Sequence, residues 1–161
     1  MARVYVSIGS NIDRARNIRA ALDALAARFA NLEQSRIYES TAVGFAGDPF
    51  YNLVVAFDAE QTPREIVSLL HGIEDQQGRV RGGERFAART LDLDLLLYDD
   101  LQMRDGKLVL PRDEITRYAF VLRPLAELAP DTRHPVIGRT YAELWDDFSA
   151  EDQELWPVEL E

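Results

Sequence analysis

Cysteine is missing from this sequence, and lysine and histidine are scarce, with one lysine and two histidines among 161 residues. Without cysteine there is no disulfide, no thiolate metal site and no cysteine nucleophile, and the composition fits the reducing cytoplasm, which is the predicted location. A net charge of −10 argues against nucleic-acid binding, which usually needs a basic surface. No apolar run is long enough to cross a membrane or to form a signal peptide, so no membrane partner is expected.

The basic charge comes almost entirely from arginine and is unevenly placed. Between Arg79 and Arg89, four arginines surround one acid, Glu84, and a Gly82-Gly83 pair that predicts a loop able to close over a ligand. Arginine donates planar, bidentate hydrogen bonds to phosphate or carboxylate, so the loop predicts a small anionic ligand. The alternative is a solvated loop whose arginines pair with nearby acids. An acidic tail from about residue 149 is expected to be solvated.

The apolar periodicity predicts one mixed domain. Strand-like segments lie at 3–8, 32–38, 52–58 and 90–98, and residues at helical spacing predict helices at 14–29 and from Pro63 to about Gly78. Shorter helices are expected at 119–128 and 141–148. This β-α-β-β-α-β order predicts an α+β, ferredoxin-like core with an antiparallel sheet and added C-terminal helices, in a single domain over residues 1–161. The fold hosts many functions and decides none.

The sharpest chemical signal is RTLDLDLLLYDD at 89–100. In a strand, alternate side chains point the same way, so Asp92 and Asp94 share one face and the intervening leucines share the other. Two carboxylates this close need a neutralising arginine or a divalent cation. Magnesium is commonly held by one or two acids plus substrate phosphates, and together with the arginine loop this pattern predicts phosphoryl transfer. A pair of surface acids on an edge strand is the alternative.

Three further residues suggest a pocket for a planar ring. The amide of Asn52 offers a donor and an acceptor to the edge of a heterocycle, and Phe50 and Phe120 can stack on its faces. Each of these residues, taken alone, is more often part of a core or a turn. His71 lies near the apolar stripe of the second predicted helix, where a lone histidine is usually structural.

Several motifs together resemble the 6-hydroxymethyl-7,8-dihydropterin pyrophosphokinases of folate biosynthesis, and the block from Glu74 to Asp94 is the most specific part. The resemblance implies transfer of pyrophosphate from ATP to the hydroxymethyl group of the pterin, leaving AMP. The matching segments are VSIGSN at 6–11, YESTAVG at 38–44, FYNLVV at 50–55, IEDQQGRVR at 73–81, RTLDLDLLLY at 89–98 and AFVLRPLAELAP at 119–130.

The resemblance also implies roles for individual residues. Two Mg²⁺ ions would be held by Asp92 and Asp94, and these acids together with Arg79 and Arg89 would be catalytic. ATP would be bound by His71, Glu74, Arg79, Arg81, Arg89, Arg112, Arg117 and Tyr118. The pterin would be bound by Ser40, Thr41, Val43, Phe50, Asn52 and Phe120. Both substrates are small molecules, and a monomer is expected.

The sequence departs from the family pattern at several positions. Ser40-Thr41 replaces a threonine-proline pair, His71 stands where a glutamine often faces the nucleotide, and Phe86 replaces a tryptophan. After the proline at 111, Arg112 and Tyr118 occupy positions that often hold a histidine and an arginine in contact with ATP. Arg112 is a hypothetical phosphate donor, and Arg117, one residue early, is a hypothetical replacement for the arginine.

Two other functions are compatible with parts of this pattern. A divergent paralogue could bind a pterin or a nucleotide without chemistry, although a pure binder has little reason to keep Asp92 and Asp94 beside an arginine loop. A nucleotidyltransferase also combines a Gly-Ser element with paired acids, but the acids usually follow closely. Here Gly9-Ser10 and Asp92 lie far apart in the chain, which disfavours that reading.

Overall fold

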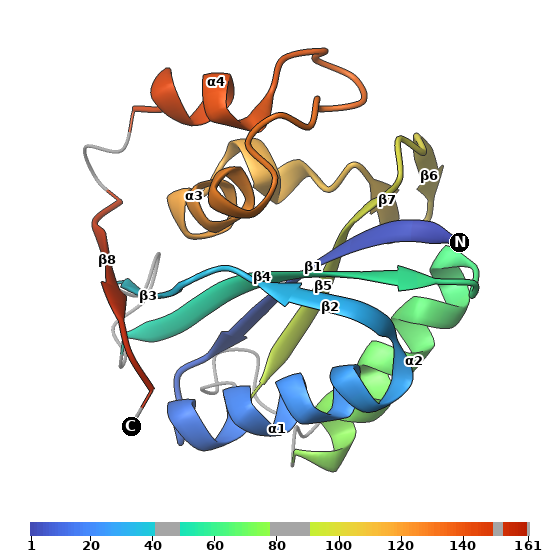
Figure 1. The fold of residues 1–161 in the computed structure, drawn as a ribbon, viewed down its shortest axis with the longest axis vertical. Helices are drawn as coiled ribbons and strands as arrows, with labels where there is room; N and C mark the ends of the chain where they lie inside the picture. Colours follow the sequence, from blue (N-terminus) through green and yellow to red (C-terminus); the bar gives the residue numbers. More distant parts are fainter. Residues whose placement is uncertain (41–48, 78–90, 150–152, 161) are drawn as a thin grey trace.

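The computed structural model describes residues 1–40, 49–77, 91–149 and 153–160. Within these ranges, two helices and the strands of the main sheet other than the last occupy the chain up to Tyr98, and a small hairpin, three short helical segments and a last strand follow (Figure 1). The elements are β1 (Ala2–Ser10), α1 (Arg14–Arg28), β2 (Ala30–Gln34), β3 (Ile37–Ser40), β4 (Phe50–Ala59), α2 (Pro63–Gln76), β5 (Asp92–Tyr98), β6 (Met103–Asp105), β7 (Leu108–Leu110), the 3₁₀ helix η1 (Asp113–Thr116), α3 (Ala119–Leu128), α4 (Tyr141–Asp146) and β8 (Leu155–Val158).

The main sheet has the order β5-β1-β4-β3-β8, with β2 pairing beside β3 on the same edge of β4. All of these pairings are antiparallel. If β2 and β3 are taken as two halves of one strand, the core is the ferredoxin-like arrangement, so the predicted α+β fold is confirmed. The small β6–β7 hairpin stands apart as a second sheet.

The predicted strand at 32–38 is wrong in one respect, because the chain forms two strands there. At the break, the backbone N–H of Ser35 donates to the Val54 carbonyl at 2.9 Å, and the Ser35 hydroxyl accepts from the Val54 N–H at 3.0 Å. The next N–H, that of Arg36, donates to the carboxylate of Glu127 on α3 at 2.7 Å. The ladder is interrupted because a side chain from another layer takes up this backbone donor.

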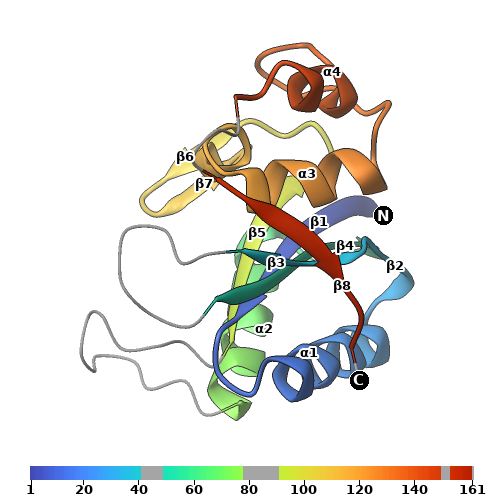
Figure 2. The same ribbon diagram turned by 90° about the vertical axis from the view of Figure 1, so that its left-hand side faces the viewer.

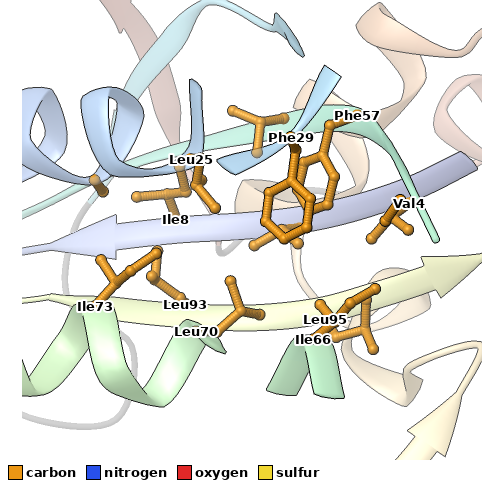
Figure 3. Packing of buried hydrophobic residues seen from close by; sticks show 14 of the residues in the cluster. Val4, Ile8, Leu25, Phe29, Phe57, Ile66, Leu70, Ile73, Leu93 and Leu95 are labelled. Atoms are coloured by element: carbon orange, nitrogen blue, oxygen red, sulfur yellow. The ribbon is translucent and has the colours of Figure 1, made fainter. Parts of the chain in front are cut away.

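Helices cover both faces of the sheet. In Figure 1, α1 and α2 lie on one side, and α3 and α4 lie on the other. The larger core fills the space between the sheet and the first pair of helices, and Figure 3 shows Ile8 and Leu93 there with Leu25, Leu70 and Ile73. A second buried cluster, which includes Val54, Leu96 and Leu125, joins the opposite face to α3. Both faces of the sheet are therefore covered by helices. A polar side chain on the α3 face is an exception, because most of the residues that pack there are apolar.

The ends of two helices follow local rules. Thr62 and Glu65 form a reciprocal capping box with Pro63 in the first turn, so α2 begins where the sequence predicts. The predicted helix at 119–128 has the observed bounds of α3. No helix in the described ranges combines the length and apolar character that crossing a membrane requires.

The last described segment of the acidic tail keeps half-buried or exposed side chains, but its backbone is not a free end. Leu155–Val158 forms β8, which pairs antiparallel with β3 and extends the main sheet. The side chain of Arg123 on α3 also donates to the Leu155 carbonyl at 3.3 Å. Backbone pairing and this contact hold the segment against the domain in spite of its acidic surroundings.

Candidate active site

A cavity of about 280 Å³ lies on the sheet face that α3 covers, where β1, β4 and β5 meet η1 and the start of α3. It collects polar groups from segments far apart in the sequence. Its lining residues are Ser7, Gly9, Ser40, Phe50, Asn52, Asp92, Asp94, Leu96, Arg112, Glu114, Tyr118, Phe120 and Val121.

The acid pair lies on β5 as its periodicity predicts. Leu91, Leu93 and Leu95 are buried in the larger core, whereas Asp92 and Asp94 are half-buried and line the cavity on the opposite face. The neighbouring strand β1 has small residues opposite both acids, which leaves space beside the carboxylates. Gly9 pairs with Asp92 in the β1–β5 register, and Ser7 pairs with Asp94.

Gly9 also pairs with Asn52 of β4, so the glycine separates the acid pair from the amide. Adjacent strands lie about 4.8 Å apart, which places Asp92 and Asn52 roughly 10 Å from each other across a floor without a side chain. A Cβ atom added to Gly9 would lie 2.8 Å from the Asn52 Oδ1. The floor is therefore as close to the amide as packing allows.

Aromatic side chains form the walls of the cavity near Asn52. The rings of Tyr118 and Phe120 stack with their centroids 5.0 Å apart, and Phe50 lies on the β4 side. The amide of Asn52 is 4% exposed and donates to the Ser40 hydroxyl at 3.3 Å. This half of the cavity offers a buried amide between ring faces, which suits a flat polar heterocycle.

The charge at the other half is strongly negative and has one basic partner among the described lining residues. Arg112 Nη2 lies 3.6 Å from Asp94 Oδ1, and the same guanidinium forms a close ion pair with Glu114. Burial, then the neighbouring Asp92 carboxylate, raise the pKa of the Asp94 carboxyl to about 7, while Arg112 opposes the rise. Glu114 was missed at the sequence level, although its spacing of two residues from Arg112 was a usable signal.

Glu74 on α2 binds the backbone of β5 between the two acids. Its side chain is 2% exposed, and its Oε2 accepts the Leu93 backbone N–H at 2.8 Å, at the residue between Asp92 and Asp94. The same carboxylate contributes to the raised pKa of Asp94. Glu74 does not line the cavity, and this contact gives it a positioning role for β5.

The other predicted site residues divide into two groups. His71 is exposed on α2 and Arg117 is exposed just after η1, and neither lines the cavity. The remaining ones lie outside the described residues, namely Thr41, Val43, Arg79, Arg81 and Arg89.

The donor set fits a hard divalent cation whose remaining ligands come from a substrate. Asp92 and Asp94 present carboxylate oxygens into one cavity, where burial and then their mutual repulsion raise the pKa of Asp94. No group of three or more His, Cys, Asp or Glu side chains suited to a metal occurs within the described ranges. Magnesium is commonly held in this way, by one or two carboxylates together with phosphate oxygens and water.

Comparison with known proteins decides the family. The sequence pattern of the 7,8-dihydro-6-hydroxymethylpterin-pyrophosphokinase (HPPK) family matches residues 5–130. The chain belongs to this family. The matched range begins within β1 and ends just after α3, and it contains every described residue of the cavity.

Curated relatives of this HPPK chain have names that agree with this family. A 2-amino-4-hydroxy-6-hydroxymethyldihydropteridine pyrophosphokinase of Pseudomonas aeruginosa is 43% identical over 150 residues, covering 88% of this chain and 89% of the relative. The enzyme of the same name from Methylorubrum extorquens is 40% identical over 135 residues, covering 81% and 85%. A crystal structure of Plasmodium falciparum HPPK-DHPS matches with a TM-score of 0.70 at 14% identity. The match covers 91% of this chain and 43% of that one, and it supports the fold.

In this HPPK chain, Asp94→Asn is expected to stabilise the metal-free protein at alkaline pH. The pKa of Asp94 is about 7 when folded against an ordinary 3.8. Between these values only the folded state keeps the proton, so this carboxyl makes the protein less stable as the pH rises from about 4 to 7, and the full penalty persists above. The side chain is 35% exposed, and solvent screening reduces the penalty to on the order of 1 kcal/mol.

Thermal unfolding of Asp94→Asn and the wild type at pH 5 and pH 8, with a chelator present, checks the predicted stabilisation. The variant should have a higher midpoint than the wild type at pH 8 and a smaller advantage at pH 5. Asp100→Asn is the matched control, since Asp100 is exposed in the turn after the same strand. Equal midpoints for Asp94→Asn and the wild type at pH 8 would contradict the raised pKa.

Proposed function

We propose that this chain transfers pyrophosphate from ATP to the hydroxymethyl group of 6-hydroxymethyl-7,8-dihydropterin, giving the pterin diphosphate and AMP. The observation that carries the proposal is the cavity itself, in which a pair of acids and an aromatic-lined amide face each other across Gly9. The family and the names of its curated relatives point to the same reaction.

The pterin belongs at the amide end. A bicyclic ring lying over Gly9 would meet the Asn52 side chain at its polar edge and the rings of Phe50 and Phe120 at its faces. Its hydroxymethyl arm would then extend toward Asp92 and Asp94, roughly 10 Å from the amide. Ser40 holds the Asn52 amide in place. Thr41 and Val43 complete the proposed pterin site and lie outside the described residues.

The triphosphate belongs at the acid end. Asp92 and Asp94 would hold two Mg²⁺ ions, which when bound supply positive charge to the phosphate oxygens. Arg112 lies close enough to Asp94 to donate to a phosphate held there. We assign further ATP contacts to Arg79, Arg81 and Arg89, outside the described residues, and to His71, Arg117 and Tyr118. Glu74, expected from the resemblance to bind ATP, is buried and acts through the Leu93 N–H instead.

The reaction is an in-line displacement at the β-phosphorus. The pterin hydroxyl oxygen forms a bond to that phosphorus while the bond from it to the oxygen bridging the α- and β-phosphates breaks, and AMP leaves with that oxygen. The hydroxyl proton passes to solvent or a phosphate oxygen, since no described side chain is assigned as its base. The chain's contribution is to orient the ring, exclude water through Tyr118 and Phe120, and place positive charge at the phosphates.

One reaction mixture tests the proposal. Protein, ATP, 6-hydroxymethyl-7,8-dihydropterin and Mg²⁺ are incubated and separated by chromatography, with omission of each component as the control. AMP and the pterin diphosphate should appear only in the complete mixture. Released inorganic pyrophosphate would indicate nucleotidyl transfer instead. Binding of pterin or ATP without either product would favour a non-catalytic paralogue.

Arg112→Ala is expected to raise the KM for ATP by roughly tenfold, because a charge-assisted hydrogen bond to phosphate is lost. In the metal-free protein it should also raise the pKa of Asp94 further, since this arginine opposes the rise. Initial rates over a range of ATP concentration measure the first effect, and a pH titration of the metal-free variant measures the second. Arg104→Ala, at an exposed position on β6, is the control. Unchanged ATP affinity and turnover would remove Arg112 from the site.

The proposal includes a cytoplasmic monomer that acts on small molecules. Sedimentation of the purified chain with and without ATP tests the monomer, and a dimer at working concentration would contradict it.

A further inference from the structure

The last described segment of the chain is attached to the start of α3 through one side chain. The Oε1 of Gln153 accepts the backbone N–H of Ala119 at 2.8 Å, and its Nε2 donates to the Arg117 carbonyl at 3.0 Å. Ala119 is the first residue of α3, and its N–H is one of those that a helix leaves without an internal partner. Tyr118, at the N-cap position, makes no side-chain capping bond. Gln153 therefore supplies a cap from 34 residues away.

The two residues that flank Ala119 are wall residues of the cavity. Tyr118 precedes it and Phe120 follows it, and their rings stack on each other with centroids 5.0 Å apart. The direction of both rings depends on the backbone of this first turn. A bond to the N–H between them, and one to the carbonyl before them, holds that backbone at the edge of the site.

The same segment is also attached to the opposite wall. Two residues beyond Gln153, Leu155 pairs with Ser40 in the β8–β3 register, and Ser40 accepts from the Asn52 amide. Arg123 of α3 donates to the Leu155 carbonyl. In both ribbon views β8 runs from the layer of α3 and α4 past β3 (Figure 2). Residues 153–158 thus connect the aromatic wall to the strand that orients the amide.

We propose that Gln153 is a positioning residue for the pterin: it fixes the first turn of α3 so that Tyr118 and Phe120 keep the ring slot at the right width. The inference rests on the proposed function, because it assigns that slot to the pterin. Gln153 itself does not line the cavity, so it acts only through the α3 backbone. The acid pair belongs to β5 and stays in place without it.

This arrangement predicts a separation of KM from kcat. Gln153→Met keeps the approximate volume and removes both hydrogen bonds, and it should weaken pterin binding by roughly tenfold. The value of kcat at saturating pterin should stay within about twofold, because a ring that is bound still reaches the same acids. The KM for ATP should change less than the pterin affinity, because the acid pair and Arg112 at the phosphate end do not depend on the first turn of α3. Gln153→Glu keeps an acceptor for the Ala119 N–H but faces the Arg117 carbonyl with an oxygen, so its effect should be intermediate.

The experiment measures pterin dissociation constants by fluorescence titration with a non-hydrolysable ATP analogue and Mg²⁺ present, alongside kcat and unfolding midpoints. Glu154→Gln is the matched control, at the exposed neighbouring position, and should match the wild type. Amide hydrogen exchange at Ala119 adds a readout apart from activity. It should speed up in Gln153→Met, which removes the acceptor, and change much less in Gln153→Glu, which keeps it.

The outcomes separate the two proposals. An active wild type whose pterin affinity is the same in Gln153→Met overturns the inference alone. Equal losses of kcat and thermal stability in both Gln153 variants also overturn it, because the residue would then be purely structural. If Gln153→Met fails to fold, fast exchange at Ala119 together with normal pterin affinity in Gln153→Glu decides against the inference, because the cap would then be lost without any effect on the ring. A wild type that neither binds the pterin nor forms AMP overturns the proposed function, and the inference with it.

Discussion

Asp92→Asn is expected to lower turnover by about a thousandfold while the protein stays folded. Asp92 is half-buried at the cavity end of β5, and its carboxylate carries part of the negative charge that a cation would neutralise. Asparagine has nearly the same volume, so the packing of Leu91 and Leu93 beneath it is unchanged. The loss should therefore come from charge and not from structure, and raising the Mg²⁺ concentration should recover only a small part of it.

Initial rates of AMP formation over a range of Mg²⁺ concentration measure the effect. Asp100→Asn makes the same chemical change at an exposed position just after the strand, and it should retain full activity. Unfolding midpoints of both variants show whether the fold is kept. Near-normal magnesium-dependent turnover in Asp92→Asn would rule out the metal role assigned to this residue.

Gly9→Ala is expected to weaken pterin binding by roughly ten- to hundredfold, which is the range for leaving a buried polar group unpaired. The added Cβ would lie 2.8 Å from the Asn52 Oδ1, closer than real Cβ contacts come. Asn52 is buried and donates to Ser40, so its amide has to turn away from the position in which it would read the pterin edge. The affinity for ATP and Mg²⁺ should change much less.

A second glycine provides the control. A Cβ added to Gly72 on α2 meets nothing within 4 Å, so Gly72→Ala should leave pterin affinity unchanged and stabilise the helix by about 0.5–1 kcal/mol. Calorimetric titration of each variant with the pterin makes the comparison, and Asn52→Ala gives the size of the full loss. Wild-type pterin affinity in Gly9→Ala would show that the amide does not bind the ring at this place.

The sequence by itself determined what depends on local period and local chemistry. Alternation along β5 placed Asp92 and Asp94 on one face and the leucines on the other, because a strand repeats every two residues whatever it pairs with. The capping residues around Pro63 placed the start of α2 in the same way. The order of the elements predicted the ferredoxin-like core, and the run of motifs was enough to indicate the family.

Only the tertiary structure decided which distant groups meet. Asn52 and Asp92 lie on opposite sides of Gly9 because β1 pairs with both β4 and β5, and local spacing carries no information on that register. The carboxylate of Glu74 turned out to hold the Leu93 N–H. In the same way, the pairing of Arg112 with Asp94 depends on how the segment after β7 returns to the sheet.

The end of the chain is the clearest case of this limit. Its acidic composition predicted a solvated tail, yet Gln153 caps α3 and Leu155–Val158 extends the sheet. Composition indicates only whether the side chains of a segment favour contact with water. Its place in the fold depends on whether backbone donors and acceptors elsewhere are left unpaired, and here the edge of β3 and the first turn of α3 offered them.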